Sequence, residues 1–336
     1  EFDFDAQTVL VKVNGRDAAT LPLAEYTTSI DSFNLKNNGS LYVSLVNFKV
    51  FRTFDRGDYV PEPIVPEDKN GYVVGMNVCS LWRNGAHFGW SCISPYDDPH
   101  PVLGYYDEGN PETADWEIKY ITEHGIDFQA FCIYMGQSSE PQRPGTEHLY
   151  DGFMNAKYSN LSKFCVIWEC ANAGSPNSMD EWKQNYVPYF IENYFKDPRH
   201  ITVDNRPILC VFGTDKLASR LGGNAKVKEA FDYLEDEIKK YGFDGMIYLA
   251  CGSANSNIAA MGFDGCYAYN WGNSGYQLKT NTASILASAK KGSPYTVPTI
   301  SVGFNSIPWH GIRYPMMSMT DYAAAQEWIK TEYLPT

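Results

Sequence analysis

The sequence predicts an α/β protein, a TIM-type (β/α)8 barrel that follows a small antiparallel β domain. A three-residue motif, glycine–apolar–aspartate, occurs at Gly125–Asp127, Gly242–Asp244 and Gly262–Asp264, each time directly before a short apolar run. Glycine fits the left-handed position that ends a helix, and aspartate stabilises the turn into the strand that follows. Helices that end in glycine and lead into buried strands are typical of parallel β/α proteins. The three aspartates are expected at the amino ends of strands, so we assign them to stability.

The first part of the chain has a different pattern. Thr8–Val13 and Leu41–Phe51 alternate as strands do, and Asn14-Gly15 is a strong hairpin-turn signal. A Pro-rich stretch follows, which is expected to be stiff and extended. The predicted organisation is a small β-sandwich-like domain at residues 1–58, a linker at 59–70 and the barrel at 71–336.

Strands and helices alternate in the rest of the chain. The predicted strands are Tyr72–Trp82, Phe128–Met135, Phe164–Ala171, Pro207–Gly213, Met246–Gly252, Gly265–Trp271 and Val297–Asn305. The predicted helices are Pro111–His124, Met179–Phe195, Ala225–Tyr241, Asn281–Lys290 and Thr320–Tyr333. A closed barrel needs one more strand, so we expect the last strand to lie outside this sequence or to come from another segment. A doubly wound sheet is the alternative, but the Gly-rich phosphate turn expected after its first strand is missing.

The overall composition excludes several classes of partner. A net charge of −13 argues against binding to nucleic acid or to an anionic membrane surface. No apolar run reaches the roughly 18 residues of a membrane span. Aromatic residues make up 15% of the chain, including 24 Tyr and 8 Trp. Such side chains suit a surface that stacks on sugar rings, and an aromatic-rich core is the alternative explanation.

The eight cysteines do not have the spacing of a disulfide framework or a zinc site. Most of them lie within apolar strand-like runs, where cysteine acts as a small hydrophobic residue. We therefore expect free thiols, with no metal and no cofactor. The acidic charge and the sugar-binding character described below favour an extracytoplasmic location (periplasmic, cell-surface or secreted). Free thiols argue against it, unless the surroundings are reducing.

Polar and aromatic side chains gather at the predicted carboxyl ends of the strands, where parallel barrels place their chemistry. Flat rings stack on the apolar faces of sugars, and amides and carboxylates bind the hydroxyl groups. The sequence therefore predicts an oligo- or polysaccharide as the partner. The candidate substrate-binding residues are Trp82, Tyr105, Tyr106, Asp107, Tyr134, Asn270, Trp271, Asn305, Trp309 and His310.

Glu169 is the candidate catalytic residue. It ends a buried strand in phase with Cys165 and Ile167, so its side chain is expected to point into the barrel, where burial would raise the pKa of the carboxyl group. The alternative is a structural glutamate paired with a cation. The two-carboxylate layout of many retaining sugar-cleaving barrels is not visible, because the fourth predicted strand offers only Asp215 and the seventh offers none. For Asp107, a favourable charge at the start of the next helix is the alternative.

Three stretches resemble the glycoside hydrolase family 99-like group, which includes WbsX-type glycosyltransferases: Gly104–Asp107, His124–Phe131 and Asp197–Ile208. The resemblance implies a (β/α)8 barrel that acts on glycans, with endo-α-mannosidase and endo-α-mannanase as the family's activities. The family's catalytic carboxylates lie in a Glu-x-x-Glu stretch near the last strand. This sequence has no such stretch, so those roles are carried over to no residue. The sugar contacts implied here are Tyr105, Tyr106 and Asp107.

We expect, from these observations, a bacterial, secreted, metal-independent and endo-acting glycoside hydrolase in polysaccharide degradation. The first alternative is a protein that binds a polysaccharide without cleaving it, since binding needs only the aromatic residues. The second is a glycosyltransferase, which usually carries an Asp-x-Asp metal site or a basic phosphate-binding site. The only Asp-x-Asp in this sequence, Asp3-Phe4-Asp5, lies in the predicted β domain.

Overall fold

The computed structural model describes residues 2–3, 8–13, 16–22, 59–67, 71–82, 90, 93, 101–136, 147–172, 174–252, 255–269, 295–303, 305–311 and 316–334. The chain divides into two compact units, Glu1–Arg56 and Gly57–Thr336.

The first unit contains a three-stranded antiparallel sheet in the order β1-β2-β3. Its strands are β1 (Phe2–Asp3), β2 (Thr8–Val13) and β3 (Arg16–Pro22). Val13 pairs with Arg16, which leaves a two-residue connection at the predicted hairpin turn, Asn14-Gly15. That turn and the predicted strand Leu41–Phe51 lie outside the described residues, so the sandwich-like domain stays a prediction.

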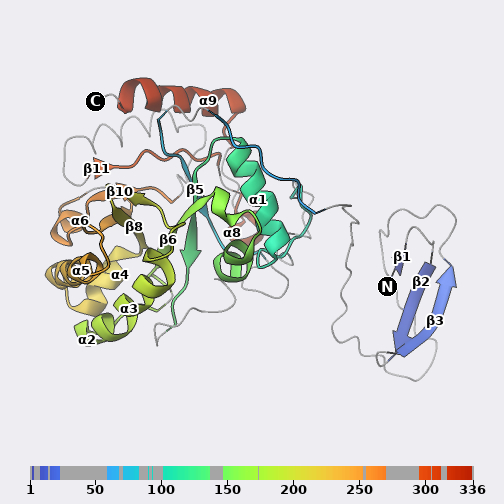
Figure 1. The fold of residues 1–336 in the computed structure, drawn as a ribbon, viewed down its shortest axis with the longest axis horizontal. Helices are drawn as coiled ribbons and strands as arrows, with labels where there is room; N and C mark the ends of the chain where they lie inside the picture. Colours follow the sequence, from blue (N-terminus) through green and yellow to red (C-terminus); the bar gives the residue numbers. More distant parts are fainter. Residues whose placement is uncertain are drawn as a thin grey trace. The chain divides into compact units, whose positions relative to one another are not determined.

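The second unit is built on a parallel sheet whose strands pair in chain order, β4-β5-β6-β8-β9-β10-β11 (Figure 1). Its strands are β4 (Gly75–Val78), β5 (Phe128–Ile133), β6 (Lys163–Glu169), β8 (Arg206–Phe212), β9 (Ile247–Cys251), β10 (Gly265–Tyr267) and β11 (Tyr295–Thr296). This order is that of a barrel, and it excludes the doubly wound alternative, in which the order reverses at a switch point. The last predicted strand was misplaced: β11 ends at Thr296, one residue before the predicted start, and Val297 N donates to Cys266 O at 2.7 Å.

The helices lie between these strands and cover the outer face of the sheet (Figure 1). Two predicted helices are single helices in the structure, α1 (Pro111–Glu123) and α5 (Asn224–Lys239). The helix predicted at Met179–Phe195 is a continuous run of four segments, α2 (Met179–Glu181), η5 (Trp182–Tyr186), α3 (Val187–Phe190) and η6 (Ile191–Phe195). The last predicted helix consists of α9 (Met319–Trp328) and η8 (Ile329–Tyr333). Not predicted were η2 (His148–Gly152), η3 (Phe153–Asn155), η4 (Ser159–Leu161), α4 (Thr214–Leu221), α6 (Ser256–Ala260) and α8 (Ile307–His310). Most of these are only one turn long, too short for a clear helical period. The predicted helix Asn281–Lys290 lies outside the described residues.

The glycine–apolar–aspartate motifs end helices and lead into strands, as the sequence predicts. Gly125, Gly242 and Gly262 have φ angles of 75°, 90° and 84°, in the left-handed region. The carboxylate of Asp127 accepts a hydrogen bond from Val74 N at 2.9 Å, and that of Asp264 accepts one from Tyr248 N at 2.9 Å. The aspartates therefore tie the amino ends of neighbouring strands together.

Alternate residues of the strands point to opposite faces of the sheet, and both faces are buried. The outer face packs against the helices, for example Trp168 against Trp182 with ring centroids 5.7 Å apart. The inner face carries a separate apolar cluster that includes Cys132, Ile167 and Leu249.

The sheet curves around this inner cluster. Asn77 on β4 donates hydrogen bonds from Nδ2 to the carbonyl oxygens of Ala268 and Tyr269, each at 3.2 Å, so the first strand reaches the end of β10. The described strands form a parallel half-barrel, with β4 and β11 at the two ends of the pairing order.

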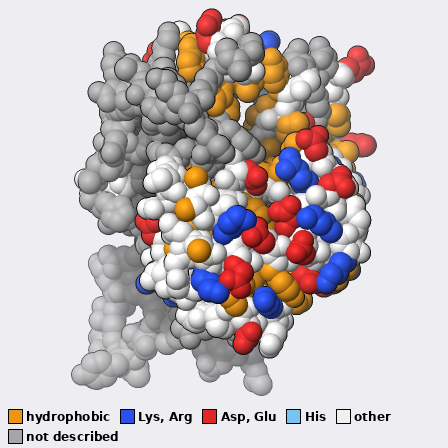
Figure 2. All heavy atoms as spheres, turned by 90° about the vertical axis from the view of Figure 1, so that its left-hand side faces the viewer, with side chains coloured by type: hydrophobic (Ala, Val, Ile, Leu, Met, Phe, Trp, Pro, Cys, Tyr) orange, Lys and Arg blue, Asp and Glu red, His pale blue; other side chains and the backbone are white. Residues whose placement is uncertain are grey.

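The outer surface of the helical layer carries acidic and basic side chains in alternation. Along α5, Lys226 pairs with Glu229, Lys228 with Asp232 and Lys240 with Glu237, each within one helical turn. Figure 2 shows basic and acidic side chains interleaved over this face of the molecule. Such exposed pairs contribute little stability, and both signs of charge are present, so this face is a solvated helical surface.

Residues 59–67, which we predicted as part of a linker, lie against α1. Val60 is buried, its carbonyl oxygen accepts a hydrogen bond from the Tyr158 hydroxyl at 2.9 Å, and Ile64 N donates to Glu123 at 3.1 Å. The centre of this contact is Asp115 of α1, which is fully buried. Its carboxylate accepts hydrogen bonds from the Tyr59 hydroxyl, from Lys157 N at 2.9 Å and from Tyr158 N at 2.7 Å.

We expect Asp115→Ala to lower the free energy of unfolding by about 2–3 kcal/mol, because it removes the shared acceptor of two backbone donors and one hydroxyl. Urea unfolding followed by circular dichroism measures this loss. Tyr59→Phe is the control, since it removes one donor and leaves the two backbone hydrogen bonds in place, and it should cost about 1 kcal/mol. Equal costs for the two substitutions would contradict the central role of Asp115.

Candidate functional site

Four aromatic side chains meet beyond the carboxyl end of β4. We call Trp82, Trp90, Tyr105 and Tyr106 the aromatic cluster. Trp90 is buried at its centre: its ring stacks on Trp82 with centroids 4.7 Å apart and lies 5.4 Å from Tyr105 and 5.0 Å from Tyr106. The indole N–H of Trp90 donates to Tyr106 O. Tyr105 is 42% exposed, so the cluster presents an aromatic face to solvent.

Three of the predicted sugar-binding residues therefore come together, around a fourth that was not among the candidates. The only sequence signal for Trp90 was the density of aromatic residues in the loop between residues 82 and 106. A stacked pair of indoles beside two phenol rings is an arrangement that suits the apolar face of a sugar ring.

Deeper in the half-barrel, two tyrosines meet a pair of thiols. Cys132 Sγ donates to the Tyr269 hydroxyl at 3.5 Å, and the Tyr269 ring lies 5.8 Å from Phe212. Burial raises the pKa of Tyr134 and of Tyr269, and neighbouring Cys132 and Cys79 raise both further. Both hydroxyls therefore stay protonated and can donate hydrogen bonds to a ligand. Tyr134 was predicted, whereas Tyr269 lies one residue before the predicted Asn270.

Glu169 lies at the carboxyl end of β6 and is 6% exposed. Its register partner is Phe212 on β8, and its charge acts on Tyr134, so the carboxylate lies on the inner side as predicted. Oε1 accepts hydrogen bonds from Ala171 N at 3.0 Å and Asn172 N at 3.1 Å. These bonds to the loop after β6 fix the carboxylate in one position.

A second buried carboxylate lies behind the aromatic cluster. Glu108 is 1% exposed; its Oε2 accepts a hydrogen bond from Leu81 N at 3.0 Å and lies 3.7 Å from His148 Nδ1. The other ring nitrogen of His148 lies 2.6 Å from Glu117 Oε2. Burial raises the pKa of Glu108. Glu108 was noted in the sequence only beside Asp107, as a charge at the start of the next helix or a ligand contact. Nothing in the sequence linked it to His148, which is 40 residues away along the chain and joins it only through the fold.

The remaining candidates are not part of these groups. Asp107 is exposed, and its carboxylate accepts a hydrogen bond from Gly109 N at 2.9 Å in the turn before α1. Asn305 accepts one from Ile307 N at 3.2 Å, at the start of α8. Trp309 and His310 belong to α8, but their side chains lie outside the described ones, as do Asn270 and Trp271 entirely. The roles of all these residues stay predictions.

The described part of the chain contains no group of three or more His, Cys, Asp or Glu side chains that could hold a metal ion. None of its helices has both the length and the apolar character of a membrane span.

A family model for the glycosyltransferase WbsX matches residues 95–333. The chain belongs to the WbsX family. The comparison with curated proteins gave no match.

Solved structures are similar to this WbsX family member at low sequence identity. A GH99 endo-alpha-mannosidase from Bacteroides thetaiotaomicron is 17% identical, with a TM-score of 0.50, over 68% of this chain and 66% of that one, just under two thirds of its length. The same enzyme in complex with bis-tris-propane is 15% identical, with a TM-score of 0.53, over 78% and 79% of the two chains. A glycoside hydrolase-like protein is 14% identical, with a TM-score of 0.53, over 80% and 82%. These likenesses show that the half-barrel is similar in fold to GH99 barrels.

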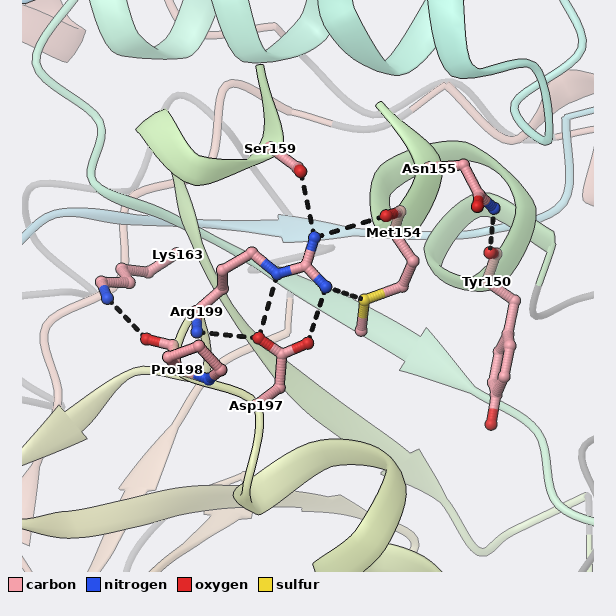
Figure 3. Close-up of polar contacts among 8 residues, drawn as sticks. All are labelled: Tyr150, Met154, Asn155, Ser159, Lys163, Asp197, Pro198 and Arg199. Carbon is pink, nitrogen blue, oxygen red and sulfur yellow. Dashed lines mark hydrogen bonds and ion pairs between the residues drawn. The ribbon is translucent and has the colours of Figure 1, made fainter. Parts of the chain in front are cut away.

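The family-like stretch Asp197–Ile208 is structural in this WbsX protein. The Asp197 carboxylate forms a bidentate ion pair with the Arg199 guanidinium (Figure 3). The same guanidinium donates a hydrogen bond to the Ser159 hydroxyl at 3.0 Å. After the two-residue strand β7 (Thr202–Val203), Asp204 and Asn205 form a left-handed turn into β8. All of this lies at the amino ends of the strands, as does a cavity of about 290 Å³ beside His200. The aromatic cluster lies at the carboxyl ends.

The seven described cysteines are free thiols, and we expect them to react slowly in the folded protein. Burial raises the pKa of Cys251 and of Cys266 to about 11, so their thiolates form only at strongly alkaline pH. Labelling with iodoacetamide in a Cys92→Ser variant should be slow at about pH 8, near the usual thiol pKa. In urea all seven should react, and equal rates in the folded and unfolded protein would contradict this burial.

Proposed function

We propose that this WbsX family member is a glycan-active glycoside hydrolase, similar in activity to an endo-α-mannosidase. The observation that carries the proposal is the aromatic cluster at the carboxyl end of β4, at the same edge of the sheet as Tyr134, Tyr269 and Glu169 at the ends of three other strands. Cys79 lies between the two groups, since burial raises the pKa of its thiol while both tyrosine hydroxyls and the charge of Glu108 also affect it. A ligand stacked on the cluster would extend toward these polar groups.

Each part of this arrangement has a role in glycan binding. The exposed face of Tyr105 and the ring of Trp82 would stack on a sugar, and the two buried phenols would donate hydrogen bonds to its hydroxyls. The open face of the cluster suits a long chain that passes across it, which supports endo-action. Complete closure into an eight-stranded barrel is part of the same proposal, as is an extracytoplasmic location, where polysaccharides are available.

Glu169 is the carboxylate that we propose for acid or base chemistry. Hydrogen bonds from Ala171 N and Asn172 N hold it in place, and catalysis depends on such preorganisation. Hydrolysis with either stereochemical outcome uses a pair of carboxylates. At the strand ends in the described part of the chain, Glu169 is the only inward-facing carboxylate, so the second member of the pair is not assigned.

The test is incubation of the purified protein with α-linked mannan oligosaccharides, with products followed by mass spectrometry. Release of internal fragments supports endo-hydrolysis. Glu169→Gln keeps the size of the side chain and should abolish turnover while affinity for the oligosaccharide is retained. Full turnover in Glu169→Gln would reject the catalytic role and leave Glu169 with the structural role of holding the loop after β6.

Glycosyltransfer is the second candidate, and the family name favours it. It requires a nucleotide-sugar donor, whose binding would raise the melting temperature. A thermal shift with nucleotide sugars and no cleavage of oligosaccharides would replace hydrolysis by transfer. Affinity for mannan without cleavage or transfer would leave a binding protein.

Tyr105→Ala is expected to weaken binding of an α-mannan oligosaccharide about tenfold, or about 1.4 kcal/mol, because it removes the most exposed ring of the aromatic cluster. The melting temperature should stay unchanged, since the ring is 42% exposed. Tyr241→Ala is the matched control: Tyr241 is 49% exposed but follows α5 on the charged face. Calorimetric titration measures both, and equal losses would contradict a site at the cluster.

A further inference from the structure

The pair Glu108 and His148 has an unusual feature for buried charged groups. The side chains are 1% and 3% exposed, yet Glu108 Oε1 and His148 Nδ1 have no hydrogen-bond partner among the described residues. An orphaned buried polar atom is costly, and more so when the group is charged. The two groups face each other, with Nδ1 3.7 Å from Oε2, a distance that allows attraction but is too long for a hydrogen bond.

Glu108 forms hydrogen bonds with the backbone of Leu81 and Trp82, where the aromatic cluster begins. Its carboxylate accepts a hydrogen bond from Leu81 N at 3.0 Å, and its own N–H donates to Trp82 O at 3.1 Å. Tyr106, another member of the cluster, is two residues before Glu108 in the chain. Glu108 therefore holds the backbone of Leu81 and Trp82, in the segment that follows β4 and carries the Trp82 ring.

Several neighbouring elements place charged or titratable groups around the pair. Glu117 on α1 lies 2.6 Å from His148 Nε2, whereas β5 contributes only the apolar ring of Phe131, 4.9 Å from the imidazole. Burial raises the pKa of the Tyr106 hydroxyl and of the Cys79 thiol, and the negative charge of Glu108 raises both further.

One more buried carboxyl group is near. Glu147, the residue before His148, is 4% exposed, and its Cβ lies 3.2 Å from where a Cβ on Gly109 would be. It therefore packs beside the backbone that carries Glu108.

The number of protons on the pair decides whether Glu108 is stable in its position. When His148 is protonated, each ring N–H faces a carboxylate, Nε2 toward Glu117 and Nδ1 toward Glu108. When it loses a proton, the remaining N–H stays with Glu117, the closer partner, and a lone pair on Nδ1 faces the buried Glu108 carboxylate. That carboxylate then has no compensating charge, and it gains free energy by moving toward water. Movement of Glu108 pulls on Leu81 and Trp82.

We propose that Glu108 and His148 are positioning residues that hold the aromatic cluster together while they share a proton and loosen it when that proton leaves. The proposal rests on the proposed function in one respect, that a glycan binds at the cluster. Binding would then be strongest at acidic pH and weaken as the pH rises.

The direction of the pH dependence follows from both groups. Burial lowers the pKa of His148, but Glu117 and Glu108 outweigh that effect and raise it above its usual value of 6.5. Burial raises the pKa of Glu108 above 4.5. A raised pKa stabilises the assembled state below the unfolded-state value and loses that stabilisation as pH rises through the folded-state value. Both groups therefore favour assembly at lower pH, and the loosening is expected above about pH 6.5.

Circular dichroism tests the proposal without any ligand. The stacked rings of Trp82 and Trp90 give an exciton couplet, which should shrink in a titration from about pH 5.5 to 9, across the raised pKa of His148. Trp168 and Trp182 are also stacked, 5.7 Å apart, so Trp90→Phe identifies the source of the change. The pH-dependent part of the signal should vanish in Trp90→Phe. A change that persists there arises elsewhere and overturns the proposal.

Three uncharged variants separate positioning from simple stability. Glu108→Gln removes the buried charge but keeps an acceptor for Leu81 N, so the couplet should stay at its acid value at every pH. His148→Gln should also abolish the pH dependence. Glu117→Gln should retain it with a lower midpoint, because His148 loses its closest negative charge. An unchanged titration of the couplet in Glu108→Gln contradicts the proposal. If Glu108→Gln does not fold, an unchanged titration midpoint in Glu117→Gln contradicts it instead.

Binding of an α-mannan oligosaccharide, measured in the same pH series, separates this proposal from the proposed function. Affinity should fall about tenfold as the couplet is lost, and it should be independent of pH in Glu108→Gln. A couplet that titrates without affinity at any pH supports the pair and rejects the glycan site. Affinity with a couplet that does not titrate supports the site and rejects the pair.

Discussion

The alternation of side chains along the parallel strands is the constraint on which the rest of this structure depends. Each strand is buried on both faces, so one set of residues fills the inside of the half-barrel while the other set packs against helices. The inside is narrow, and it is filled by small and medium side chains such as Ala130, Cys165 and Cys210. The cysteines therefore act as packing residues. The hydrogen-bond contact with Cys165, together with burial, raises the pKa of the Cys210 thiol.

The candidate site begins where this packing ends. Toward the carboxyl ends of the strands the inner face changes from aliphatic and thiol groups to Tyr134, Glu169 and Tyr269, all of which need polar partners. The loop after β6 provides them for Glu169, and thiols provide them for Tyr269. Because neighbouring strands are in register, a polar residue at one strand end is next to the polar residue at the next. The half-barrel thus concentrates polar groups at one edge without any long-range sequence signal.

Local patterns predicted most of the fold because the signals of parallel β/α units are local. Gly125, Gly242 and Gly262 marked the helix ends, and Asn110 and Pro111 marked the start of α1, where Asn110 accepts from Glu112 N at 2.9 Å. The errors fell where no such signal exists, at helices of one turn and at β11. Trp82, Tyr105 and Tyr106 were predicted because they follow a strand and are aromatic. The contribution of Trp90 was missed, because what distinguishes it is burial among the other three rings.

The cluster of Glu108, His148 and Glu117 shows why such residues escape prediction from sequence. Each one alone reads as an ordinary surface residue, and Glu108 in particular reads as a favourable charge before the amino end of α1. The fold buries Glu108 and His148 together, at a cost that an apolar pair of similar size would avoid. A buried charged pair is therefore weak evidence for stability. Its position directly behind the backbone of Trp82 makes control of the aromatic cluster the physical reason to retain it, since an apolar pair could hold the loop but could not respond to a proton.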